Sequence, residues 1–176
     1  MHAVSDEQLI QWVAQGDASC VGTLFERHHK GVYRYCLQIT KQPPMSEDVV
    51  QEVFLKVMKK AKSYRGDGSF KAWLFNIARN VTFDHLKSAQ RRAQPPGLLD
   101  QASPSSEDLV SGSQELGRVS KALASLPEKV REVIWLGRFE FDGYEELAVA
   151  LGCSPGTARV RMHRAMKQLA SAFGEI

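Results

Sequence analysis

The sequence has no long apolar run and little cysteine. None of its 176 residues belong to a stretch of about 18 apolar side chains, which excludes a membrane-spanning helix. The N-terminal residues lack the basic and apolar parts of a signal peptide, so we expect a cytoplasmic protein. Cys20, Cys36 and Cys153 form no CxxC pair, and this spacing argues against both a disulfide framework and a closed zinc site.

Phosphate-binding glycine loops and complete catalytic sets are also missing. The pair Gly66 and Gly68 lacks the lysine and the spacing of a phosphate loop. His28 and His29 precede Cys36, but His28 falls on an apolar stripe and no third ligand completes a metal site. An enzyme is therefore the least favoured function, and we expect no cofactor, no metal and no small-molecule ligand.

Charge is distributed unevenly along the chain. Residues 1–92 carry fourteen Lys and Arg against nine Asp and Glu, and residues 118–176 carry nine against seven. Residues 93–117 carry four acids and no Lys or Arg. Two basic blocks joined by an acidic segment are typical of separate modules that touch nucleic acid.

Sustained alternation of apolar and polar residues is absent, and apolar residues instead recur at steps of three and four. This period predicts an all-α fold. Ser5 is expected to cap the first helix, Ser46 to cap a helix that runs to Lys62, and Ser69 to open the longest helix. Trp73 falls on the apolar stripe of that longest helix and is expected in the core.

Proline and serine interrupt the helical pattern between the two basic blocks. We therefore predict two small helical domains, residues 1–92 and 107–176, joined by a flexible acidic linker at 93–106.

The last fifty residues predict a helix-turn-helix. A short helix over 144–151 is followed by Gly152, which suits a helix end, and then by Ser154 as a cap and Pro155 at a first helical position. The second helix, over 156–172, contains four basic residues and no acid. Such a helix suits the phosphate-lined major groove of DNA.

With these residues in view, the chain resembles the extracytoplasmic-function (ECF) sigma factors, which belong to the sigma-70 family of bacterial RNA polymerase subunits. Three separated motifs carry the resemblance in the family's order. DVVQEVF at 48–54 is similar to the family's polymerase-binding helix, and FKAWLFNIARN at 70–80 to the helix after its promoter-reading loop. The third motif consists of LP at 126–127, YEELA at 144–148 and GTARVR at 156–161, in the order found in the family's C-terminal helix-turn-helix module.

The resemblance implies a sigma factor that binds RNA polymerase core and directs promoter-specific transcription initiation. It implies core binding, against the clamp helices of the largest polymerase subunit, by Asp48, Gln51, Glu52 and Phe54. It implies recognition of the −10 element, with a pocket for a flipped base, by Lys56, Ser63, Tyr64, Arg65, Asn80, Lys87, Arg91 and Arg92. It implies recognition of the −35 element by Thr157, Arg159, Val160, Arg161, His163, Arg164 and Lys167.

The implied partners are core polymerase (through its clamp helices and flap), promoter DNA, and an anti-sigma factor that is often membrane-associated and can hold the chain at the inner membrane. The alternative is a two-domain helix-turn-helix regulator whose N-terminal half senses a ligand or oligomerises. Such a regulator would bind operator DNA without core polymerase.

Overall fold

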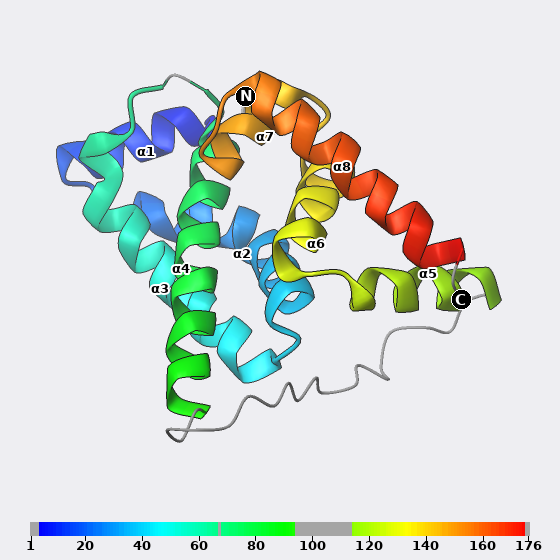
Figure 1. Cartoon of the computed structure of the whole chain (residues 1–176). Helices are drawn as coiled ribbons and strands as arrows, with labels where there is room; N and C mark the ends of the chain where they lie inside the picture. The colour runs from blue at the N-terminus through cyan, green and yellow to red at the C-terminus, as the bar shows by residue number, and fades with distance from the viewer. Residues whose placement is uncertain (1–3, 67, 94–113, 175–176) are drawn as a thin grey trace.

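A computed structural model describes residues 4–66, 68–93 and 114–174, with only the backbone for 114–116 (Figure 1). These residues form helices and no strand, which confirms the all-α prediction. The helices of the N-terminal half are α1 (Asp6–Gln15), α2 (Cys20–Thr40), α3 (Pro43–Lys60), the 3₁₀ turn η1 (Ala61–Ser63) and α4 (Phe70–Ala93). Apart from Ala93, the predicted linker lies outside the described residues.

The C-terminal half is also helical. Its elements are α5 (Gln114–Ser125), α6 (Glu128–Trp135), the π-helical turn η2 (Leu136–Glu140), α7 (Tyr144–Leu151) and α8 (Pro155–Gly174). Within the described ranges, no helix is both long enough and apolar enough to cross a membrane.

The first helix begins and ends as its local sequence predicts. The Ser5 hydroxyl accepts a hydrogen bond from the backbone N–H of Gln8 at 3.2 Å, and the Gln8 side chain accepts one from the Ser5 N–H at 3.2 Å. This reciprocal capping box satisfies two donors that the helix itself leaves free. Gly16 ends α1 with a φ of 111°, a conformation that glycine adopts without a steric penalty.

The start of α3 differs from the prediction. The helix begins at Pro43 and not at Ser46, because a proline in the first turn needs no backbone N–H and has its φ already set for a helix. Ser46 is buried inside the helix, where its hydroxyl donates to the Gln42 carbonyl at 2.9 Å and bonds the Thr40 hydroxyl at 2.9 Å. The prediction that Ser46 caps α3 is therefore wrong.

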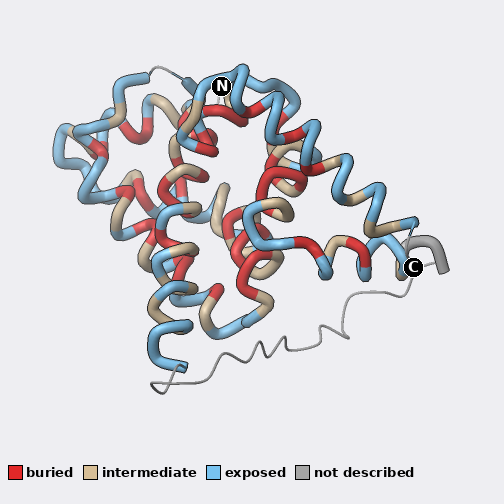
Figure 2. Tube along the Cα trace, in the orientation of Figure 1, coloured by how far each residue is buried: buried red, intermediate tan, exposed pale blue. Residues whose placement is uncertain are grey.

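The two halves share one hydrophobic core. Buried residues line the facing sides of the helices, drawn red in Figure 2, and α4 packs against α7 while α2 packs against α6. At the junction the ring of Phe75 meets the ring of Tyr35 at 5.7 Å and the ring of Phe141 at 5.7 Å. The sequence predicts two helical domains joined by a linker, and in the structure these two halves are in direct contact.

Within the C-terminal half, η2 passes close to α7 and α8 at Gly137. A Cβ added there would overlap Cε of Met162 and lie 3.1 Å from Cδ2 of Leu147, and both of these side chains are buried. The terminal methyl of a methionine can move, but a second close neighbour restricts where it can go. Packing therefore favours glycine at this position.

We predict that Gly137→Ala lowers the free energy of unfolding by about 1–2 kcal/mol, because a well-packed core resists an added methyl group. Urea denaturation followed by circular dichroism measures the change. Gly22→Ala on α2 is the matched control, since its added Cβ meets nothing within 4 Å, and it should leave stability equal or raise it. Equal stability of the two variants would contradict the packing described for Gly137.

Candidate functional site

An exposed surface of α3 combines charge with apolar area. It consists of Asp48, Gln51, Glu52, Leu55 and Met58, and we call it the α3 surface. Leu55 is 55% exposed and Met58 is 42% exposed. Large apolar side chains beside carboxylates are typical of a surface that a protein partner covers.

Phe54 does not belong to this surface. It is 5% exposed, and its ring meets that of Phe25 edge-on at 4.9 Å in the N-terminal core. Leu55 and Met58 follow Gln51 by four and seven residues and share its outer face. Leu55 and Met58 are therefore the exposed apolar residues of this part of α3, and Phe54 is not.

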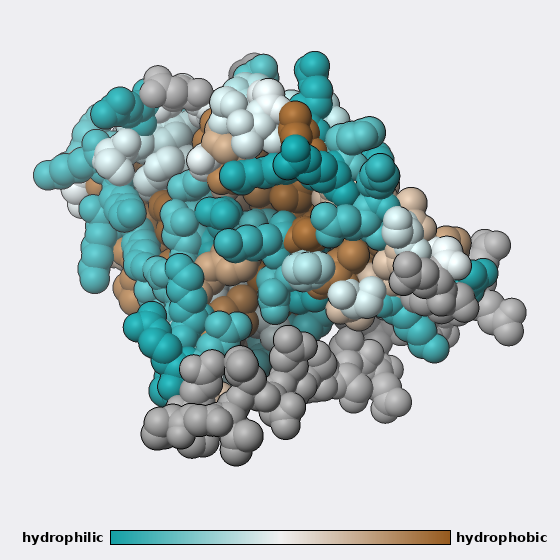
Figure 3. All heavy atoms as spheres, viewed as in Figure 1, coloured by the Kyte–Doolittle hydropathy of each residue, from teal (hydrophilic) through white to brown (hydrophobic). Residues whose placement is uncertain are grey.

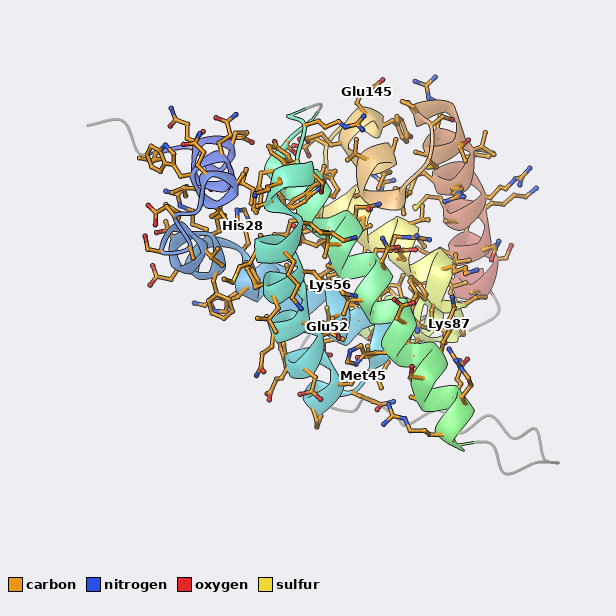
Figure 4. All side chains as sticks on the ribbon, turned by 90° about the vertical axis from the view of Figure 1, so that its left-hand side faces the viewer. His28, Met45, Glu52, Lys56, Lys87 and Glu145 are labelled. Carbon is orange, nitrogen blue, oxygen red and sulfur yellow. The ribbon has the colours of Figure 1, made fainter. Side chains whose placement is uncertain are left out.

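Glu52 lies at the edge of the α3 surface, next to α4. Its Oε1 is 2.9 Å from Nζ of Lys56 and its Oε2 is 2.8 Å from Nε2 of His85. The hydrogen bond with His85, followed by that with Lys56, lowers the pKa of Glu52. Figure 4 shows Glu52 and Lys56 side by side on α3. Lys56, which was predicted to contact DNA, thus forms an ion pair with Glu52, which was predicted to contact polymerase.

A pocket of about 200 Å³ lies between η1, the start of α4 and α7. Its lining residues are Ser63, Tyr64, Arg65, Gly66, Gly68, Ser69, Trp73 and Val149. Three of these, Ser63, Tyr64 and Arg65, were predicted to contribute to a base pocket.

Aromatic rings form one wall of this pocket. The rings of Tyr64 and Trp73 meet at 5.4 Å with 62° between their planes, and the Tyr64 hydroxyl donates to the Gly68 carbonyl at 2.8 Å. Trp73 is half-buried and lines the pocket. Trp73 was expected in the core and does pack against it, but periodicity alone did not predict that it also lines a pocket.

The other residues predicted for −10 recognition lie along α4. Asn80, Lys87 and Arg91 follow Trp73 by seven, fourteen and eighteen residues, so all four share one face of the helix. Arg92 turns about 100° away from that face. At about 1.5 Å per residue, Arg91 lies roughly 27 Å from Trp73 along the axis. Asn80, Lys87 and Arg91 therefore form a line along α4 that leads away from the pocket, and we call this line the α4 track.

The helix-turn-helix forms as the local sequence predicts. Gly152 ends α7 with a φ of 63°, and the Ser154 hydroxyl accepts the N–H of Thr157 at 3.2 Å at the start of α8. Arg159 of α8 lies over the ring of Tyr144 of α7 at 5.3 Å, which joins the two helices on their outer side.

All of the residues predicted for −35 recognition are exposed on α8. They are Thr157, Arg159, Val160, Arg161, His163, Arg164 and Lys167. The inner face of the helix is formed by Ala158, Met162 and Ala165, which are buried. Val160, although apolar, is 47% exposed and does not belong to that inner face. In Figure 3 the apolar residues on the visible side gather between α4 and α8, and most of the remaining surface is hydrophilic.

Comparison with known proteins agrees with this geometry. Residues 24–92 match the model of sigma-70 region 2, and residues 116–169 match that of sigma-70 region 4. The ECF RNA polymerase sigma-E factor of Escherichia coli K12 is 31% identical to this chain over 94% of it and 93% of the relative. This chain belongs to the ECF sigma factors. The RNA polymerase sigma-H factor of Pseudomonas aeruginosa is 28% identical over 96% of this sigma factor and 93% of the relative.

Two solved structures resemble the whole fold of the sigma factor. CnrH, in complex with the cytosolic domain of CnrY, is 26% identical with a TM-score of 0.70 and covers 97% of both chains. The sigma factor RpoE of Bartonella quintana, in complex with the anti-sigma factor NepR, is 26% identical with a TM-score of 0.67. This similarity covers 87% of this chain and 96% of that one.

The region 2 match contains the α3 surface, nearly all of α4 and the pocket residues other than Val149, and the region 4 match contains α7, with Val149, and most of α8. Sigma-70 domains of these two kinds bind polymerase core and promoter DNA. The alternative of a ligand-sensing regulator is not favoured, because the N-terminal half is a sigma-70 domain.

Cys36 lies in the core and not at a reactive site. It is fully buried, its Sγ is 3.5 Å from the Thr82 hydroxyl, and burial raises the pKa of its thiol to about 12. Because the thiolate is the nucleophile, a thiol with this pKa is almost unreactive near neutral pH.

We predict that iodoacetamide at pH 8 modifies the half-buried Cys20 and Cys153 of the native chain before it modifies Cys36. Roughly one Cys36 in ten thousand is a thiolate at that pH. Peptide mass spectrometry measures the three rates, and denaturant should make Cys36 react as fast as the others. Rapid labelling of Cys36 in the native chain would show that the core is open at this position.

Proposed function

We propose that this sigma factor directs initiation through three separate surfaces: the α3 surface binds polymerase core, the pocket and α4 track hold the −10 element, and α8 reads the −35 element. The observation that carries the proposal is the exposed, acid-free face of α8 in a chain whose other half matches sigma-70 region 2. A duplex-binding module and a module for melted DNA are the two parts that promoter recognition requires.

The pocket suits a base that has left the DNA stack. Extruding a base costs a few kcal/mol, and a pocket with aromatic walls offsets part of that cost by stacking, at about 1–3 kcal/mol per base. Tyr64 and Trp73 provide ring faces, and Arg65 provides a positive charge at the rim. Beyond the pocket, the Asn80 amide can read a base edge while Lys87 and Arg91 bind phosphates.

The arginines of α8 suit duplex DNA. Arg161 and Arg164 lie three residues apart on the exposed side of the helix. An arginine can donate two hydrogen bonds to a guanine edge or bind phosphate oxygens. Because α8 carries no acid, it presents nothing that repels the DNA backbone.

The sigma factor supplies binding energy and the polymerase supplies the chemistry, so we propose no enzymatic activity for this chain. Since it acts with polymerase on chromosomal DNA, its place of action is the cytoplasm. The relatives CnrH and RpoE were solved with CnrY and with the anti-sigma factor NepR, respectively. By this similarity we propose an anti-sigma factor as a third partner here, held at the inner membrane.

The direct test is run-off transcription from a promoter library with purified core polymerase, together with a gel shift with and without core. Initiation from a defined set of promoters that requires this chain would support the proposal. Tight, specific binding of the chain alone to duplex DNA, with no effect on polymerase, would refute it.

We predict that Arg164→Ala lowers use of −35-dependent promoters by about 5- to 150-fold, because a base-reading arginine contributes about 1–3 kcal/mol. If Arg164 binds a phosphate instead, the substitution should remove one phosphate contact. A plot of the logarithm of the holoenzyme's DNA-binding constant against the logarithm of the salt concentration should then be less steep by about one. Gln168→Ala, four residues further on the same face, is the matched control. Equal losses for the two variants would contradict the assignment of Arg164.

We predict that Leu55→Ala weakens core binding by about tenfold, or 1.4 kcal/mol, and leaves thermal stability unchanged. Phe54→Ala should instead lower the free energy of unfolding by about 3–5 kcal/mol, because it leaves a cavity in the hydrophobic core.

Asp48→Ala should weaken binding to core polymerase as Leu55→Ala does, with the exposed Asp142→Ala as its control. Fluorescence anisotropy with labelled core measures binding, and unchanged affinity for both α3 variants would refute the α3 surface.

A further inference from the structure

A side chain from α1 caps the start of α4. Glu7 is half-buried, and its Oε1 accepts the backbone N–H of Phe70, 63 residues away along the chain, at 3.1 Å. The Ser69 hydroxyl accepts the N–H of Ala72 at 3.2 Å. The first N–H groups of a helix have no partner inside it, and a carboxylate is a favourable acceptor there because the helix dipole is positive at this end. A local hydroxyl and a distant carboxylate therefore cap α4 together.

Phe70, whose N–H Glu7 accepts, supports the aromatic wall of the pocket from behind. Phe70 is fully buried, and its ring lies 6.3 Å from the ring of Tyr64 and 6.0 Å from that of Trp73. On its other side it meets the ring of His28 at 5.5 Å. Phe70 and Trp73 both belong to the first turn of α4. The position of that turn therefore sets where the rings of the pocket wall lie.

The start of α1 is itself held by α2. Arg27 donates to the Val4 carbonyl at 2.9 Å and to Oδ1 of Asp6 at 2.6 Å, and Nε2 of His28 bonds Oδ2 of Asp6. Successive side chains on a helix point about 100° apart. Asp6 thus reaches α2 while its neighbour Glu7 reaches α4. In Figure 1, α1 runs below the connection from α3 to α4, and it packs against η1, α2 and α4.

The attachment of α1 to the core does not require Glu7. Leu9, Ile10 and Val13 of α1 are buried in the core and hold the helix by apolar contact. Among the residues that the structure describes, no Lys, Arg or His forms an ion pair with Glu7. The bond to Phe70 is therefore the contact that distinguishes this carboxylate. The match to sigma-70 region 2 begins at residue 24, so it does not include α1.

We propose that Glu7 is a positioning residue for the base pocket: its carboxylate fixes the first turn of α4 and, through Phe70, holds the rings of Tyr64 and Trp73 where a flipped base can stack. Glu7 does not line the pocket and acts only through these residues. This inference rests on the proposed function, because it requires that the pocket receive a base of the −10 element. It adds a residue of α1 to the parts of the chain that serve −10 recognition.

The test measures base capture separately from the other contacts of the holoenzyme. The probe is a labelled single strand with the −10 element of a promoter that the run-off assay identifies, together with copies in which each base in turn is replaced by an abasic site. Fluorescence anisotropy gives the affinity of the holoenzyme for each strand. For the unmodified chain we expect one position at which base removal weakens binding by about 5- to 150-fold, as stacking on aromatic rings predicts. This base-to-abasic ratio measures the pocket.

Substitutions of Glu7 should change that ratio. Glu7→Ala should lower it at least threefold, because the first turn of α4 loses an acceptor, and should leave the affinity for core polymerase unchanged. Glu7→Gln keeps an acceptor oxygen and should retain at least half of the unmodified ratio. Glu26→Ala, at an exposed position on α2, makes the same change in net charge as Glu7→Ala and should have no effect. Circular dichroism checks that each variant folds.

Hydrogen exchange observes the cap directly in the free, full-length chain. In Glu7→Ala the amide of Phe70 should exchange at least tenfold faster than in the unmodified chain, because its N–H has lost its partner. The amide of Gln8, which bonds the Ser5 hydroxyl within α1, should keep its rate. Nuclear magnetic resonance measures both amides in the same sample.

Separate results would overturn the inference and the proposed base pocket. Equal base-to-abasic ratios for Glu7→Ala and Glu26→Ala, or an unchanged exchange rate of the Phe70 amide, would overturn the positioning role. A loss of core binding in Glu7→Ala as large as its loss of base capture would do so too, because it would show a general loss of structure. If no abasic site weakens binding of the unmodified chain, the proposed base pocket is refuted, and the inference with it, whatever the exchange rates show.

Discussion

Removing a carboxylate from water is unfavourable unless a cation and hydrogen-bond donors replace the solvent. Glu132 satisfies this condition with Arg79 and Tyr35, which come from the other half of the chain. The apolar contacts of Phe75 with Tyr35 and Phe141 surround the same region. The arrangement of the two halves, in which Val149 of α7 lines the pocket beside Tyr64 and Trp73, is therefore the one in which this buried charge is paired.

Helix α4 connects the functions of the molecule, because different faces of it meet different neighbours. One face packs into the N-terminal core, a second carries Phe75 and Arg79 into the junction, and a third carries Trp73 and Asn80 to the pocket and the track. A single helix can do this because successive side chains point in directions about 100° apart. The same rigid element that positions the proposed DNA contacts also holds the C-terminal half.

Much of the fold follows from local sequence. The cap at Ser5, the helix end at Gly152 and the helix-turn-helix were predicted from residues that lie within a few positions of one another, and the structure confirms them. Errors arose where two neighbouring residues fitted the same pattern. Phe54 and Leu55 both follow the acids of α3, and only packing against Phe25 shows that Phe54 points inward.

Sequence alone therefore determined the helices, their caps and the acid-free α8, because these depend on the 3.6-residue period and on hydrogen bonds between near neighbours. Tertiary structure alone decided that Trp73 lines a pocket, that Lys56 pairs with Glu52, and that Glu132 is buried between the halves. Each of these outcomes depends on which helix packs against a given face. A periodic pattern shows that a face is apolar or charged, but it does not show what covers that face.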